Sequence, residues 1–157
     1  MIMSSRKLVL RATILALAMV SLASAQERKI KRSQLPAAVE KTVAEQSQGA
    51  TIKGFASEME KGAKVYEVSM TINGHNKDVL IDANGNVIEI EEQVAMDSLS
   101  QPVQDALKKA AGRGTIITIE SLTKNGVLVA YEGHVKRGLK RFEIQVGPNG
   151  EKLAHPE

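Results

Sequence analysis

The chain matches itself along most of its length, and this duplication limits its fold more than any other feature of the sequence. Three apolar residues reappear 64 positions later: Leu35, Val39 and Val43 as Leu99, Val103 and Leu107. One inserted residue then shifts the offset to 65, which aligns Tyr66-Glu67 with Tyr131-Glu132 and Asn84-Gly85 with Asn149-Gly150. Because the match continues past an insertion, it indicates a duplicated structural unit rather than chance composition.

Each copy begins with apolar residues spaced as on one face of a helix. Pro36 and Pro102 stand near the two starts, where the amide hydrogen that proline lacks has no helical partner anyway. The apolar positions are Leu35, Val39 and Val43 in the first segment, and Leu99, Val103, Leu107 and Ala110 in the second. Gly49 and Gly112 are expected to end these two amphipathic helices.

After each helical segment the apolar period changes from 3.6 to 2 residues, as expected for half-buried strands. The alternation covers residues 66–72, 127–135 and 142–146. Asn-Gly pairs at 73–74, 84–85, 125–126 and 149–150 supply the positive-φ positions of tight hairpin turns. We therefore predict an α+β fold of two tandem repeats, each one helix packed on an antiparallel meander of about four strands.

The first residues have the composition of a secretory signal peptide. Arg6, Lys7 and Arg11 precede an uncharged apolar segment that ends in Ala23-Ser24-Ala25. That segment is shorter than the roughly 20 residues of a spanning helix, so we expect cleavage after Ala25 and no membrane attachment afterwards. The predicted location is periplasmic or secreted. The remaining chain divides into a mobile basic tail (26–33), a first repeat (34–90), a linker (91–98) and a second repeat (99–157).

Charge and composition exclude several classes of partner. The whole chain has 21 basic and 18 acidic residues, and the signal segment holds the three extra basic ones, so the remainder is neutral. A neutral chain without tryptophan and with few other aromatic residues has neither the basic surface nor the stacking surface for nucleic acid. No cysteine is present, so stability has to come from burial rather than disulfides.

Motifs typical of catalytic or metal centres are missing from the sequence. Neither His-Glu-x-x-His nor Gly-x-Ser-x-Gly occurs, and His75, His134 and His155 stand far apart in the chain. Asp82-x-Asn84-x-Asn86 resembles the start of a calcium loop, but Val87 and Gln93 replace the glycine and the bidentate glutamate that such a loop requires. We therefore predict a hairpin turn there. We also predict that the protein is not an enzyme and has no catalytic residue, cofactor or metal ligand.

Two segments of the first copy resemble the PepSY-like family. They are Val65-Tyr66-Glu67-Val68, a Tyr-Glu-hydrophobic strand, and Leu80-Ile81-Asp82-Ala83-Asn84-Gly85, a hydrophobic-Asp-x-x-Gly hairpin. The second copy departs from this pattern, with Gly147 in place of Asp82 and Gly133 after Tyr131-Glu132. The resemblance implies a non-catalytic extracytoplasmic module that binds or restrains other proteins. Its arrangement is similar to that of tandem β-lactamase-inhibitor proteins and of the inhibitory propeptides of thermolysin-type proteases.

A helix packed on one face of a sheet leaves the other face free for a partner. The polar residues predicted on that face are Glu67, Ser69, Thr71, Glu132, His134, Arg141, Glu143 and Gln145. We therefore predict an exported binding module that inhibits or regulates a peptidase or another envelope protein. The alternative is a periplasmic small-ligand or metal-ion binding protein, suggested by residues 82–86 and the acidic run Glu89, Glu91 and Glu92. Unpaired strand edges also leave an edge-paired homodimer open.

Overall fold

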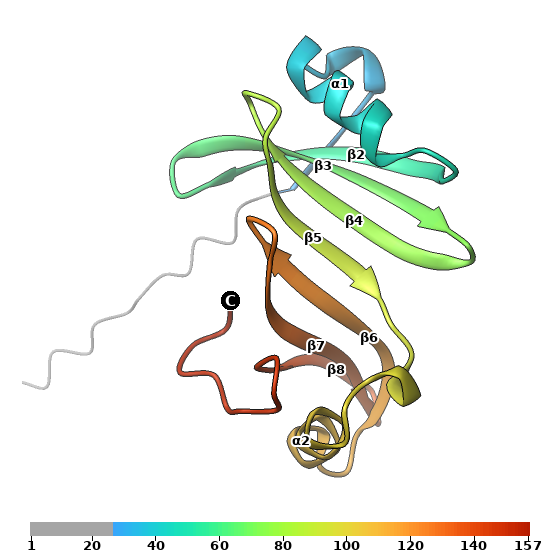
Figure 1. Cartoon of the computed structure of the whole chain (residues 1–157), viewed down its shortest axis with the longest axis vertical. Coiled ribbons are helices and arrows are strands. Elements are labelled where there is room, and N and C mark those ends of the chain that lie inside the picture. The colour runs from blue at the N-terminus through green and yellow to red at the C-terminus, as the bar shows by residue number, and fades with distance from the viewer. Residues whose placement is uncertain (1–26) are drawn as a thin grey trace, which may run out of the picture.

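The computed structural model describes residues 27–157, which form one antiparallel sheet of eight strands in sequential order (Figure 1). The strands are β1 (Arg28–Ile30), β2 (Thr51–Glu60), β3 (Ala63–Ile72), β4 (His75–Asp82), β5 (Val87–Gln93), β6 (Thr115–Lys124), β7 (Val127–Arg137) and β8 (Lys140–Val146). The helices are α1 (Ala37–Gln46) and α2 (Gln101–Ala111), and a one-turn 3-10 helix precedes each (Arg32–Gln34 and Met96–Ser98). The predicted signal peptide, residues 1–25, lies outside the described residues. Neither helix of residues 27–157 has the length and apolar character needed to cross a bilayer.

The predicted fold class, α+β with two repeats of one helix on about four strands, is wrong. Strands make up half of the described residues and helices about a fifth, so the protein is mostly sheet. One continuous sheet joins all the strands, because β5 pairs with β6 through Glu91 and Leu122. Three strands, rather than four, follow α2. Separate meanders would leave the edges of β5 and β6 unpaired, and their pairing satisfies those backbone groups.

Two segments that the sequence placed outside regular structure are strands or parts of strands. The predicted tail contains β1, in which Lys29 pairs with Ala56 of β2 and Ile30 packs against the core. The predicted linker, 91–98, begins inside β5 and then forms the second 3-10 helix. The charged residues of both segments suggested that these segments are surrounded by solvent. Both contain strand residues nevertheless, because a strand of an antiparallel sheet can keep one of its sides exposed to water.

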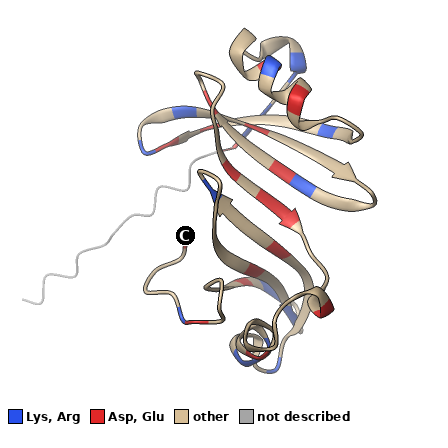
Figure 2. Ribbon diagram, in the orientation of Figure 1, with Lys and Arg blue, Asp and Glu red and all other residues tan. Residues whose placement is uncertain are grey.

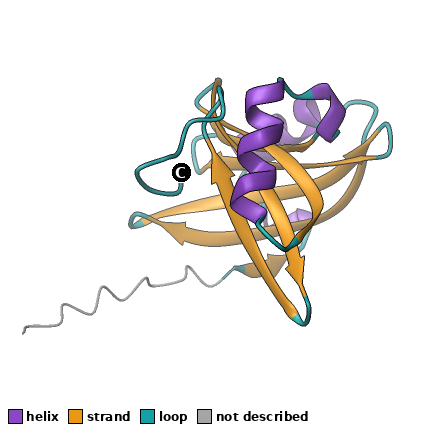
Figure 3. Ribbon diagram, turned by 90° about the horizontal axis from the view of Figure 1, so that it is seen from below, coloured by secondary structure: helices purple, strands orange, loops and turns teal. Residues whose placement is uncertain are grey.

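Both helices pack on the same face of the sheet, where each covers its own hydrophobic cluster. Val39 and Val43 of α1 lie against side chains of β3 and β4, all fully or almost fully buried: Val68, Met70, Val79 and Ile81. Val103 and Leu107 of α2 lie against Ile119 of β6 and Val146 of β8. Each buried aliphatic side chain contributes about 1.5–3 kcal/mol to folding. Figure 3 shows the curl of the sheet from the end that carries α2, which crosses in front of the strands. Neither helix covers the face of the sheet opposite the two clusters.

Three of the four Asn-Gly pairs, 73–74, 84–85 and 125–126, form the predicted hairpin turns, with positive φ at Asn73, Asn125 and the three glycines. The fourth pair, 149–150, forms a turn after β8, the last described strand, so it joins no hairpin. The β4–β5 turn also contacts α1, because the Thr42 hydroxyl donates a hydrogen bond to the Gly85 carbonyl oxygen at 2.6 Å. Gly85 has a φ of +89°, and a Cβ built there would lie 2.7 Å from the Ala38 carbonyl oxygen. Glycine is therefore required at this position both by conformation and by contact.

We expect Gly85→Ala to lower the free energy of unfolding by roughly 2–4 kcal/mol, because it adds a backbone clash to the positive-φ strain. Gly74→Ala is the matched control, since Gly74 has a φ of +83° and no atom within 4 Å of its built Cβ. Gly74→Ala should lower the free energy of unfolding by only about 1–2 kcal/mol. Urea unfolding measures both values, and equal losses would show that the contact with α1 contributes nothing.

Candidate functional site

The predicted partner-binding residues all lie on the face of the sheet that the helices leave uncovered. Along β3 the side chains alternate, so Glu67, Ser69 and Thr71 point away from the buried Tyr66, Val68 and Met70. In the last two strands the register pairs Glu132 with Gln145, His134 with Glu143, and Lys136 with Arg141. The eight residues form two groups, one on β3 and one on β7 and β8, with β4, β5 and β6 between them.

This helix-free face is concave. A pocket of about 370 Å³ on this face is lined by Asn76 of β4 together with Thr118 of β6, His134 of β7 and Glu143 of β8. Since β4 and β8 are far apart in the strand order, a flat sheet could not bring them to one pocket. Figure 1 shows the sheet curling between α1 at the top and α2 at the bottom. The face is therefore shaped to surround a protruding group.

Carboxylates gather on this concave face. The strand register places there Glu58, Glu67, Asp78, Glu89, Glu91, Glu120, Glu132 and Glu143. Figure 2 shows acidic residues on successive strands across the middle of the sheet. Lys124 lies 3.5 Å from Glu89, whereas Glu58, Asp78 and Glu91 form no ion pair within residues 27–157. The face therefore has an excess of negative charge.

Burial, together with this crowding, changes the pKa values of the carboxyl groups. Burial raises the pKa of Glu91 to about 8, and the charges of Glu89, Glu132, Glu120 and Asp78 add to the effect. Burial is also the largest reason why the pKa values of Glu67, Asp78 and Glu132 lie above their ordinary range. Glu91 thus retains its proton at neutral pH, and a positively charged ligand could displace it.

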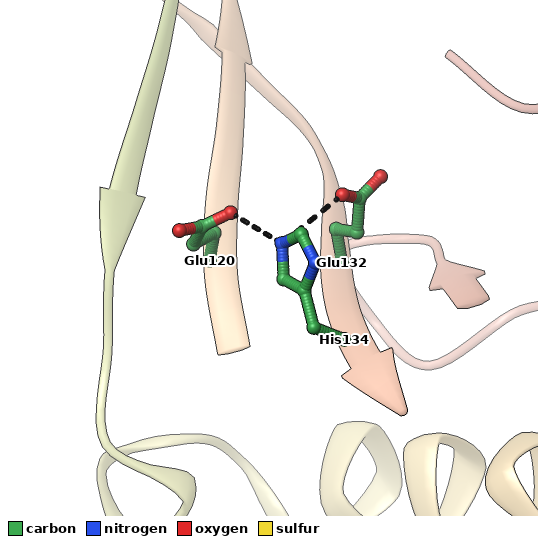
Figure 4. Close-up of side chains that lie close together, drawn as sticks. All are labelled: Glu120, Glu132 and His134. Atoms are coloured by element: carbon green, nitrogen blue, oxygen red, sulfur yellow. Dashed lines mark hydrogen bonds and ion pairs between the residues drawn. The ribbon is translucent and has the colours of Figure 1, made fainter. Parts of the chain in front are cut away.

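A histidine and three glutamates meet at the β6–β8 end of this face. Figure 4 shows His134 with two of them, Glu120 and Glu132. His134 Nε2 lies 2.9 Å from Glu120 Oε2 and 3.5 Å from Glu132 Oε1, while its Nδ1 lies 3.6 Å from Glu143 Oε1. Burial lowers the pKa of His134, but the hydrogen bond with Glu120 and the nearby negative charges outweigh this effect and raise it. One ligand atom each from Glu120, Glu132 and His134 lies within 4.8 Å of the others, close enough to hold a metal ion.

Glu120 was missed by the sequence reasoning, which used the alternation of β3, β7 and β8. A bulge between Ile116 and Thr118 interrupts the alternation of β6 and hides which residues share a face. The alternation that resumes after the bulge, with Thr118, Glu120 and Leu122 on one side, is the signal that could have revealed it.

The predicted hairpin turn at residues 82–86 is confirmed. Asp82 Oδ1 accepts hydrogen bonds from the backbone amides of Asn84 and Asn86 at 2.8 and 2.9 Å, and its Oδ2 accepts one from Asn86 Nδ2 at 2.8 Å. The hydrogen bonds from Asn86 are the main reason why the pKa of Asp82 is lowered. The carboxylate therefore holds the turn together.

No family model matches the sequence, and no curated protein matches it. Solved structures do match, among them the following three. A BLIP-like protein from Bacteroides fragilis is 22% identical with a TM-score of 0.56, over 76% of this chain and 83% of that chain. A candidate periplasmic protein from Bacteroides eggerthii is 16% identical with a TM-score of 0.60, over 74% and 84%. A DUF2874 family protein from Bacteroides ovatus is 17% identical with a TM-score of 0.58, over 76% and 84%.

The chain has a BLIP-like fold. This likeness agrees with the predicted similarity of arrangement to β-lactamase-inhibitor proteins. The PepSY-like resemblance stays a prediction, because no family model matches. At these identities the likeness describes the fold, so the chemistry of the BLIP-like concave face has to be argued from this chain's own residues.

We expect Glu91→Gln to raise the free energy of unfolding near pH 8.5 by about 1–2 kcal/mol, a figure discounted for solvent screening. The folded pKa of about 8 lies above the unfolded value of 4.5, so the folded protein holds this proton more tightly. Stability from Glu91 is therefore fully present below pH 4.5 and is lost as the pH rises through 8.

Glu92→Gln is the matched control, because it removes the same charge from the neighbouring residue on the opposite side of β5. Chemical denaturation at pH 4.5 and pH 8.5 measures both variants against the parent protein. If Glu91→Gln raised the free energy of unfolding as much at pH 4.5 as at pH 8.5, this result would contradict the pKa of about 8 for Glu91.

Proposed function

We propose that this protein is an exported, non-catalytic binding module whose concave acidic face binds a basic segment of a protein partner. The observation that supports this proposal best is the gathering of carboxylates on the one face that neither helix covers. The predicted signal peptide supports export, as does the likeness in fold to a candidate periplasmic protein. The absence of catalytic motifs from the sequence supports the non-catalytic role.

Charge complementarity selects the partner's chemistry. A lysine or arginine side chain entering the face would form charge-assisted hydrogen bonds with carboxylates such as Glu67, Asp78 and Glu91. It would also displace the proton that Glu91 retains at neutral pH. Binding should therefore weaken with added salt and should release protons.

The proposed partner is a peptidase or another envelope protein, which the module inhibits or regulates. The BLIP-like fold of the Bacteroides fragilis protein supports a restraining role by analogy of fold. The curvature of the face supports it physically, because a concave sheet surrounds a convex feature on a partner.

An edge-paired homodimer also stays a prediction, since β8 ends the described sheet with one side unpaired.

Capture from the envelope fraction of the source organism tests this function. Immobilised protein from residue 26 onward should retain a partner, and the double variant Glu67→Gln, Glu91→Gln should bind it about tenfold or more weakly. Glu45→Gln, Glu92→Gln removes two charges from outside the concave face and should bind like the parent. If the partner is a peptidase, substrate cleavage should fall when the parent protein is added.

Two outcomes would count against the proposal. Equal binding by the two double variants would place the contact surface elsewhere on the molecule. Failure of the folded parent protein to retain any envelope protein at low salt, where electrostatic attraction is strongest, would contradict protein binding as the function.

A further inference from the structure

A mixed set of donor atoms lies at the β6–β8 end of the concave face, where Glu120 and His134 line the pocket and Glu132 lies beside them. Glu120 and Glu132 face each other across paired strands, and His134 follows two residues after Glu132 on the same side of β7. Imidazole nitrogen together with carboxylate oxygen is a donor set that zinc uses in proteins, whereas calcium and magnesium use oxygen alone. The imidazole is what distinguishes this cluster from the other acidic groups of the face.

The spacing of these atoms is close to that of a zinc centre. Tetrahedral zinc with bonds near 2.1 Å holds its ligand atoms about 3.4 Å apart. His134 Nε2 already lies 3.5 Å from Glu132 Oε1. Its distance to Glu120 Oε2 is 2.9 Å, so this pair needs to open by about half an ångström. Because pairing fixes both strands, rotation of the two side chains has to supply that change.

Supporting contacts to the outer atoms of this donor set provide a separate observation. The remaining ring nitrogen of His134, Nδ1, faces the Glu143 carboxylate at 3.6 Å. The second oxygen of Glu132, Oε2, accepts a hydrogen bond from Gln145 Nε2 at 2.6 Å. Metal-binding histidines and carboxylates are usually oriented by such outer partners. Those contacts involve the other atoms of the two side chains, so Nε2 and Oε1, which lie 3.5 Å apart, remain as the metal-binding atoms.

Charge and access also suit a divalent cation. Three carboxylates surround the imidazole of His134. Among the described residues that line the pocket, Arg141 is the one lysine or arginine. The pocket of about 370 Å³ is open, so a further ligand could reach an ion held there. A zinc centre with three protein ligands keeps such an open position.

We propose that Glu120, Glu132 and His134 bind one Zn²⁺ ion, through the two carboxylates and Nε2, with the fourth position open to the pocket. Glu143 and Gln145 act as positioning residues, which hold the imidazole and the Glu132 carboxylate in place. The proposal does not rest on the protein-binding function, because the donor atoms all belong to this chain.

Titration calorimetry with zinc chloride tests the site, using metal-free protein from residue 26 onward without a polyhistidine tag. We expect one equivalent of Zn²⁺ to bind, and we expect His134→Ala and Glu120→Gln to weaken binding at least tenfold. Glu143→Gln should weaken it by about 10–100-fold, the usual effect of losing an outer partner. His75→Ala and His155→Ala are matched controls that remove an imidazole outside the cluster and should bind like the parent.

Substitution with Co²⁺ gives a second measurement. A four-coordinate site should produce visible absorption that zinc displaces and that His134→Ala lacks. Urea unfolding of each metal-free variant shows whether a loss of binding reflects misfolding, and Glu143→Gln changes no proposed metal ligand. Absence of stoichiometric zinc binding by the folded parent protein, or equal weakening by His75→Ala and His134→Ala, would overturn the proposal.

Discussion

The pairing of β5 with β6 is the contact on which the rest of the molecule depends. It joins the strands that follow α1 to the strands that follow α2, and so makes one sheet with one uncovered face. It also brings Glu91 close enough to Glu120 and Glu132 for their charges to raise its pKa. Without this ladder, the acidic groups of the two parts would lie on separate surfaces, and the concave face would not exist.

Sequence reasoning succeeded where structure is decided by neighbouring residues. The apolar stripe at Val39 and Val43 predicted the buried side of α1, and Asn73-Gly74 predicted a positive-φ turn. It failed where the deciding partner is distant in the chain. Lys29 is fixed by Ala56 and Glu91 by Leu122, and no local pattern reveals either pairing. Acidic and basic runs therefore looked like a linker and a tail, and the sequence left open whether the two repeats share one sheet.

The candidate site was predictable in part for the same reason. Strand alternation assigned Glu132, His134 and Glu143 to the helix-free face, because parity is a local property. The cluster itself depends on the strand register, which sets Glu120 opposite Glu132 across β6 and β7. The sequence showed three distant histidines, whereas the structure places His134 between carboxylates from three strands. The distances between these side chains, which set their pKa values and their affinity for a metal ion, are therefore given only by the folded structure.

The separation of the two hydrophobic clusters has a mechanical consequence. One cluster ties α1 to β3 and β4, and the other ties α2 to β6 and β8, so the β5–β6 ladder carries the connection between two stiff, packed bodies. Neighbouring strands of a sheet are twisted relative to each other by an angle that varies from pair to pair. A change of that angle at β5–β6 would therefore open or narrow the acidic face while both cores stay intact.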